Sequence, residues 1–317
     1  MVAGTSASDS QGRSGGVIPG AVDRPAYTLT GPKLSAIPVL ISVPHAGRAY
    51  PDQILADLRE PNAAALRLED RLVDRIGHAV AEQTGAALLV AHAPRAMIDL
   101  NRAPDDVDWG MFTGEGRPQS DNHAPSRRAR NGLGIVPRRV PGMGELWKRN
   151  LAVAELAQRI ASIHQPYHAA VSDALAELRA RWGAAVLLDL HSMPTIRPRG
   201  AALPPEFVVG DRFGASCHGS LVATVFSMLH RHDRISAHNR PYSGGYILER
   251  HANPKSGMHG LQLEIDRAIY LDREGSSLGV GAGKVIALLA DVVRALADQV
   301  TKLGDMSGPQ EWSEAAE

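Results

Sequence analysis

Short apolar segments alternate with helical segments along most of this 317-residue chain. Apolar runs typical of buried strands span residues 38–43, 87–91, 185–192, 207–211 and 260–265. Helical patterns span residues 62–83, 145–163, 168–181, 220–230 and 280–303, with Pro166 predicting a break or kink between two of them. Strands that are separated by helices predict an α/β fold, in which helices cover both faces of a layered sheet.

Composition excludes several classes of protein. One cysteine cannot form an internal disulfide, so a disulfide-stabilised secreted scaffold is excluded. The 34 basic residues equal the 34 acidic ones, which argues against a general nucleic-acid binder. The sequence has neither a membrane-spanning apolar stretch nor the apolar core of a signal peptide, so we expect a cytoplasmic protein that does not bind membranes. The oligomeric state is not indicated.

The two ends of the chain differ from its body. Residues 1–30 are rich in Gly, Ser and Pro, and residues 305–317 are similar. We interpret both as mobile tails, because such segments bury too little apolar area to offset chain entropy. Residues 31–304 then form a single domain. Within it, residues 103–143 have little periodicity, which predicts a functional loop or flap.

Two histidines follow apolar strands directly, namely His45 and His191. Imidazole is the commonest protein ligand of zinc, and the carboxyl ends of parallel strands meet at one edge of a sheet. Each histidine alone could equally be structural, but two at equivalent positions favour a site. A third ligand could be Glu69 or Asp70 in the following helical segment. A solvated, charged helix face is the more common meaning of such a pair.

Other polar residues lie at or near strand ends. Asn101 and Arg102 offer an amide and a guanidinium that could bind a carboxylate, or Arg102 could form a structural pair with Asp99. Asp189 could orient His191 or be a buried structural acid.

Glu264 lies between two apolar residues of a strand. An apolar setting raises the pKa of a carboxyl group and suits proton transfer, whereas a solvent-facing glutamate is the ordinary alternative. The nearby Gly244-Gly245-Tyr246 segment could allow close approach of a ligand to the backbone, or it could be a simple turn.

The motifs that contain these residues occur in an order that resembles the N-formylglutamate amidohydrolase family, over about residues 38–300. They are SVPHAG at 42–47, ED at 69–70 with VD at 73–74, DLNR at 99–102, DLHSM at 189–193, YSGGYI at 242–247, and HGLQLEI at 259–265 followed by Arg267 and Tyr270. That family is similar in fold to zinc carboxypeptidases and to aspartoacylase and succinylglutamate desuccinylase. The resemblance therefore implies a three-layer α/β/α sandwich around a mixed, mostly parallel sheet.

The resemblance also implies hydrolysis of an N-acyl amino acid, with N-formylglutamate as the expected substrate and one Zn²⁺ per chain. It indicates His45 and His191 as metal ligands and Glu264 as the catalytic general base. In the wider group a ligand glutamate stands three residues after the first ligand histidine, where this chain has Arg48. We therefore take Asp70 as the third ligand, with Glu69 as the alternative.

Asn101 and Arg102 match the carboxylate-binding pair of the group, and we add Gly245 and Tyr246 as substrate-binding residues. N-formylglutamate is a dianion, whereas the chain as a whole is neutral. We therefore expect at least one further arginine in the pocket, either Arg48 or an arginine of residues 103–143. Two alternatives stay open, a deacylase for another N-acyl amino acid and a non-catalytic binding protein on the same fold.

Overall fold

The computed structural model describes residues 12–31, 35–117, 126–197 and 203–306. Among these residues, a mixed sheet of eight strands has the order β1-β2-β4-β3-β9-β12-β10-β11. The strands are β1 (Arg13–Gly15), β2 (Tyr27–Thr30), β3 (Val39–Val43), β4 (Ala87–Ala91), β9 (Ala185–Met193), β10 (Phe207–Gly210), β11 (Ser236–His238) and β12 (Met258–Asp266). Strands β4, β3, β9 and β12 are parallel, whereas β2 and β10 pair antiparallel with their inner neighbours. The predicted mixed, mostly parallel sheet is confirmed.

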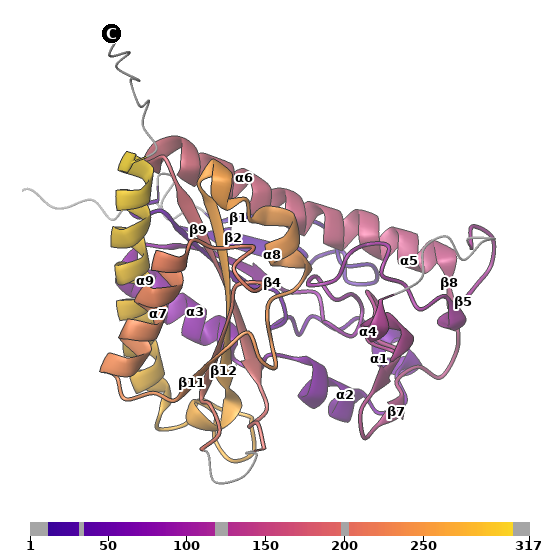
Figure 1. Ribbon diagram of the computed structural model, residues 1–317. Helices are drawn as coiled ribbons and strands as arrows, with labels where there is room; N and C mark the ends of the chain where they lie inside the picture. Colours follow the sequence, from indigo (N-terminus) through magenta and orange to yellow (C-terminus); the bar gives the residue numbers. More distant parts are fainter. Residues whose placement is uncertain (1–11, 32–34, 118–125, 198–202, 307–317) are drawn as a thin grey trace, which may run out of the picture.

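Helices cover both faces of this sheet (Figure 1). One face packs against α3 (Val73–Thr84), α7 (Gly219–Arg231) and α9 (Ala282–Met306) in a core that includes Ile41, Leu188 and Leu263. The other face packs against α6 (Gln165–Trp182) and α8 (Tyr246–His251). The fold is therefore the expected three-layer α/β/α sandwich. No helix within the described ranges is both long enough and apolar enough to cross a membrane.

Short elements extend the α6 side of the molecule. They are α1 (Asp52–Asp57), α2 (Pro61–Leu68), η1 (Trp109–Met111), β5 (Phe112–Thr113), α4 (Arg127–Arg130), β6 (Arg139–Val140), β7 (Gly144–Glu145), β8 (Leu151–Ala152) and α5 (Val153–Arg159). The remaining short elements are the π-turn η2 (Ile160–His164), η3 (Pro254–Ser256) and η4 (Arg267–Ile269). Residues 103–143 contribute several of these elements and otherwise form irregular loops that lie near the site, and residues 118–125 are outside the described ranges.

The N-terminal segment differs from its prediction. A tail was expected up to residue 30, but β2 pairs with β4 over four residues and β1 pairs with β2. Ile18, Ala26 and Leu29 are buried in the core on the α6 side. The prediction of a tail is therefore wrong for residues 12–30, because an existing sheet edge lets a short segment of low apolar content bury its few apolar side chains. Residues 1–11 and 307–317 lie outside the described part of the chain, and residues 305–306 end α9.

The predictions for the helical segment on either side of Pro166 have different outcomes. The helix expected from residue 145 begins at Val153, because residues 144–145 pair as a strand with residues 139–140. The break or kink predicted at Pro166 takes the form of a π-helical turn. α5 ends at Arg159, η2 spans Ile160–His164, and Pro166 lies in the first turn of α6, where proline is tolerated.

Candidate active site

The pairing of β9 with β12 places a row of polar side chains on one face of the sheet. In this parallel register Asp189 is opposite Gln262, and His191 is opposite Glu264. Alternate residues of a strand face opposite sides, so these four side chains leave the same face. Their neighbour Leu263 packs in the core beneath α3, α7 and α9. One face of these strands therefore carries the polar side chains of the site, and the opposite face carries apolar side chains of the core.

A break between two helices brings Asp70 to this row. The helix predicted over residues 62–83 is divided into α2, which ends at Leu68, and α3, which begins at Val73. Leu72 adopts a left-handed backbone with φ of 59°, and the Asp70 N–H donates to the carbonyl of His45 at 2.9 Å. Asp70 therefore lies in a turn beside the end of β3 and not on a helix face, which corrects the prediction.

His45, Asp70 and His191 come together as a buried group. Their nitrogen and oxygen atoms that could bind a metal all lie within 4.8 Å of one another. Nδ1 of His191 is 3.0 Å, and Nδ1 of His45 is 3.5 Å, from the same oxygen of Asp70, Oδ2. Nδ1 of His45 is buried without a hydrogen-bond partner in the described residues. A buried lone pair that faces a carboxylate and a second imidazole fits a divalent metal ion.

Two further carboxylates orient the imidazoles. Nε2 of His45 donates to Asp99 at 2.7 Å, and Nε2 of His191 donates to Asp189 at 2.8 Å. Each contact turns Nδ1 of its imidazole toward Asp70, and Nδ1 of His191 lies within hydrogen-bond distance of that carboxylate. Such an orientation is usual for histidines that bind metals. Burial opposes ionisation of Asp99, but Arg95 and His45 together hold its pKa well below the usual range. The orienting interpretation of Asp189 agrees with this geometry, whereas the sequence did not reveal the contact of Asp99 with His45.

The structure distinguishes Asp70 from Glu69. Oε2 of Glu69 lies 3.5 Å from the guanidinium of Arg71, and Glu69 is not part of the buried group. The other oxygen of Asp70, Oδ1, accepts from Ser192 at 3.1 Å and lies 3.4 Å from Arg267. These contacts fix the Asp70 carboxylate so that Oδ2 faces the imidazoles. Sequence reasoning did not assign this role to Ser192 or Arg267, although both belong to the quoted motifs.

A cavity of about 450 Å³ lies over the group, and Glu264 lines it beside His191. Glu264 is 7% exposed and its Oε1 accepts from Gln262 at 2.8 Å. Glu264 does not belong to the buried His–Asp–His group. Burial raises the pKa of Glu264 to about 6. The site therefore contains a carboxyl group that can both take up and release a proton near neutral pH.

Asn101 and Arg102 line the same cavity. Nδ2 of Asn101 lies 3.2 Å from Oε1 of Gln262, and its Oδ1 accepts from the N–H of Ile247 at 3.0 Å. Nε of Arg102 is buried and has no hydrogen-bond partner in the described chain, and it lies 3.9 Å from Asp99. Arg102 therefore brings a positive charge to the cavity, and its one ion pair recorded in the described chain is the long contact with Asp99.

The expected second arginine is on α4 and not beside His45. Arg128, from residues 103–143, lines the cavity, as do Arg67, Arg95 and Arg267. Arg48 does not line it. Arg48 pairs with Asp74 and lines a separate pocket, because the chain after His45 turns away from the group. The expectation that Arg48 contacts substrate is therefore corrected.

Gly245 and Tyr246 take different positions. Gly245 lines the cavity, and a Cβ atom on it would lie 2.7 Å from Cγ of Asn101, so only glycine leaves room for that amide. Tyr246 lines an adjoining pocket of about 750 Å³ and stacks on His164 with ring centroids 5.8 Å apart. The structure thus places Gly245, but not Tyr246, in the cavity over the His45–Asp70–His191 group.

The model of one protein family, N-formylglutamate amidohydrolase, matches residues 37–271. That range includes His45, Asp70, His191 and Glu264. The chain belongs to the N-formylglutamate amidohydrolase family. The resemblance carried by the six sequence motifs is thereby confirmed.

Relatives of this family share both sequence and structure with the chain. The N-formylglutamate deformylase of Pseudomonas aeruginosa is 29% identical over 246 residues, which cover 76% of this chain and 85% of that protein. The crystal structure of N-formylglutamate amidohydrolase from Ralstonia eutropha JMP134 matches with a TM-score of 0.78 and 30% identity, over 87% of this chain and 99% of that one. A gene product of Agrobacterium tumefaciens shares the fold, with a TM-score of 0.63 and 16% identity over 87% of this chain and 96% of its own.

Proposed function

We propose that this protein is a metal-dependent amidohydrolase that cleaves N-formylglutamate to formate and glutamate. The observation that carries the proposal is the buried His45–Asp70–His191 group, which shares one cavity with Glu264 and with Arg102. The names of the relatives in Pseudomonas aeruginosa and Ralstonia eutropha support the choice of substrate. The catalytic unit is one domain that extends from about residue 12 to residue 304, because β1 and β2 belong to the sheet that carries the site.

One Zn²⁺ ion per chain would be held by Nδ1 of His45, Nδ1 of His191 and the Asp70 carboxylate. Two imidazoles and one carboxylate are a frequent ligand set of catalytic zinc. When bound, the ion polarises the scissile carbonyl and lowers the pKa of a bound water. Asp99 and Asp189 keep both imidazoles in the tautomer that leaves Nδ1 free to bind.

Glu264 carries the proton transfers. Its carboxylate takes a proton from the attacking water as a C–O bond forms at the formyl carbon, and it gives that proton to the nitrogen as the C–N bond breaks. A pKa raised to about 6 suits both steps near neutral pH. The hydrogen bond from Gln262 holds Glu264 toward the cavity while its second oxygen stays available.

Two arginines bind the carboxylates of the substrate. Arg102, whose Nε has no hydrogen-bond partner in the described residues, binds one carboxylate close to the metal-binding group. Asn101 lines the same cavity and assists in binding that carboxylate. Arg128 at the exposed rim binds the other. Guanidinium–carboxylate pairs in a partly buried cavity give both affinity and orientation.

A panel of substrates tests the proposal. The protein is freed of metal with a chelator, reloaded with Zn²⁺, and assayed for release of formate from N-formylglutamate and of acid from N-acetylglutamate, N-succinylglutamate and N-formylmethionine. We expect metal-dependent turnover with a preference for N-formylglutamate. A preference for another N-acyl amino acid would support the alternative deacylase, and binding without turnover of any of them would support a binding protein.

A further inference from the structure

Three histidines outside the His45–Asp70–His191 group form a buried cluster. They belong to η2, α6 and α8, and they lie against the loop of residues 92–108 that contains Asn101. They are His164, His168 and His251. The ring centroids of His164 and His168 are 4.3 Å apart, and those of His168 and His251 are 5.1 Å apart and stacked. The steps of hydrolysis use none of them, yet burying three imidazoles is costly unless their nitrogens are hydrogen-bonded.

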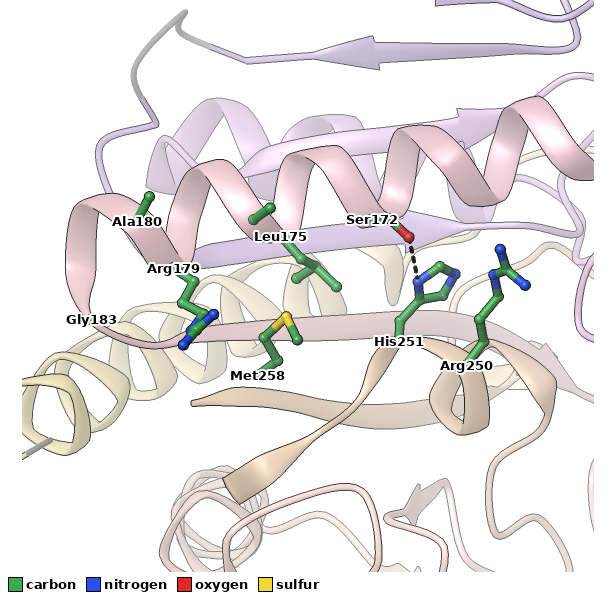
Figure 2. A pocket seen from close by; sticks show the side chains of 9 residues that line it. Ser172, Leu175, Arg179, Ala180, Gly183, Arg250, His251 and Met258 are labelled. Carbon is green, nitrogen blue, oxygen red and sulfur yellow. Dashed lines mark hydrogen bonds between the residues drawn. The ribbon is translucent and has the colours of Figure 1, made fainter. Parts of the chain in front are cut away.

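The hydrogen bonds of this cluster have a defined direction. Nε2 of His168 lies 3.0 Å from the carbonyl of Leu100, which can only accept, so Nε2 carries the proton. Nδ1 of His168 then accepts from Nε2 of His251 at 2.8 Å. Nδ1 of His251 in turn accepts from the hydroxyl of Ser172 at 3.2 Å. Figure 2 shows this outer end, where Ser172 of α6 and His251 of α8 line a surface pocket.

A second histidine donates to the same loop. Nε2 of His164 donates to the carbonyl of Arg102 at 2.9 Å. His164 is the last residue of the π-turn η2, a wide turn of the kind that often lies at functional sites. His168 and His164 thus hold the two carbonyls on either side of Asn101, which belong to Leu100 and Arg102.

Burial keeps these imidazoles neutral. It lowers the pKa of His168 to about 2 and that of His251 to about 3, and the nearby Arg250 adds to the effect. A neutral imidazole has one donor and one acceptor nitrogen. The series of hydrogen bonds from Ser172 through His251 and His168 to Leu100 therefore keeps one donor-to-acceptor direction at neutral pH.

We propose that His168 and His164 are positioning residues, which hold the Asn101–Arg102 backbone so that the amide stays against Gln262 and the guanidinium faces the cavity. Residues 92–108 form no helix or strand. Backbone hydrogen bonds to other segments hold the loop at His92, Asp99 and Asp106, whereas the carbonyls of Leu100 and Arg102 accept from histidine side chains. Without the donor of His168, the Leu100 carbonyl would be buried and unpaired, and the loop would shift to pair it elsewhere. The role assigned to Arg102 rests on the proposed function.

The tautomers provide a test that needs no substrate. Long-range ¹H–¹⁵N spectra of histidine-labelled protein at pH 7, with signals assigned from single variants, should show the neutral Nε2–H tautomer for His164, His168 and His251. A protonated ring or an Nδ1–H tautomer at His168 would overturn the proposal, whether or not N-formylglutamate is the substrate.

Substitution at His168 provides the second test. His168→Phe should raise KM for N-formylglutamate at least about tenfold, change kcat little, and leave the bound zinc at one per chain. His168→Gln, which keeps a donor, should recover part of that loss, and the neutral substrate N-formylglycinamide should be affected much less. His232→Phe is the control, because His232 follows α7 on the other face of the sheet and pairs with Asp291.

Equal losses on the anionic and the neutral substrate, or an unchanged KM, would mean that His168 has only a structural role. If His168→Phe does not fold, His168→Gln and Ser172→Ala provide the same comparison with smaller expected shifts. If the unmutated protein does not cleave N-formylglutamate, the proposed function fails. The tautomers alone then decide whether His164 and His168 hold the loop through these hydrogen bonds.

Discussion

His191 and Glu264 lie directly opposite each other on the parallel strands β9 and β12. Partners in such a register leave the same face of the sheet, so the carboxyl group of Glu264 stands next to one imidazole of the buried His45–Asp70–His191 group. Both residues belong to central strands that are buried along almost their whole length. The distance between Glu264 and His191 is therefore set by the sheet and not by a loop, which suits the accurate placement that the proposed reaction needs.

The choice of the third ligand can be tested with a matched pair of variants. Asp70→Ala should weaken zinc binding by at least about a hundredfold, because it removes one of three ligands. Glu69→Gln should retain zinc, because Glu69 faces Arg71. Competition with a chelating dye measures both affinities. Loss of zinc in Glu69→Gln with retention in Asp70→Ala would reverse the assignment.

Glu264→Gln should retain zinc and substrate binding but lower kcat by about two to four orders of magnitude, because the amide cannot take up the proton of water. Zinc content and KM are the controls for intact binding. Near-normal turnover in this variant would exclude Glu264 as the general base.

Arg102→Ala should raise KM for N-formylglutamate by about one to two orders of magnitude, since a desolvated guanidinium–carboxylate pair contributes roughly 1.5–3 kcal/mol. A neutral N-formyl compound should lose much less. Arg48→Ala removes a charge whose partner is Asp74, outside the cavity, and should leave KM unchanged. If both substrates lose equally in Arg102→Ala, Arg102 is structural.

Gly245→Ala should damage the site without unfolding the protein. The added methyl group would lie 2.7 Å from Cγ of Asn101 and would push that amide away from Gln262. We expect a fall in kcat/KM with a small change in Tm. Gly283→Ala, in α9, meets nothing within 4 Å and should keep full activity with equal or higher Tm, because alanine favours the helix. Normal kcat/KM in Gly245→Ala would show that the Asn101 amide is not needed.

Acid should destabilise the fold through the buried imidazoles. The pKa values of His168 and His251 are lowered by burial to about 2 and about 3, whereas in the unfolded chain histidine titrates near about 6.5. Between pH 6 and pH 5 the unfolded chain therefore binds protons that the folded protein does not, and the free energy of unfolding falls by up to about 1.4 kcal/mol per pH unit for each group.

Urea denaturation at pH 6 and pH 5 measures this slope. In the double variant His168→Phe, His251→Phe, the slope of the free energy of unfolding against pH should be smaller by up to about 2.7 kcal/mol per pH unit. This difference should hold whatever the stability of the variant at pH 6. Comparison with the unmutated protein cancels the contributions of other groups, such as Glu264, whose raised pKa acts in the opposite direction. An equal slope in both proteins would show that the two histidines are not neutral in the folded state.

The sequence by itself determined the central strands, the fold class and the residue types of the site. The strands at 39–43, 87–91 and 185–193 follow predicted apolar runs within a residue or two, because burial on both faces requires continuous apolar segments. His45, His191 and Glu264 could be chosen because a polar residue in or just after such a run stands out locally.

The tertiary structure decided what depends on contacts between distant segments. The apolar stripe over residues 62–83 gives no sign of the turn at Leu72, where a left-handed backbone brings Asp70 rather than Glu69 to the imidazoles. Arg48 is only three residues from His45, yet it points elsewhere, whereas Arg128 reaches the cavity from α4. Periodicity reports which side of its own helix or strand a residue occupies. Which residues meet across the chain is set by strand register and by the packing of loops, and only the folded structure contains that information.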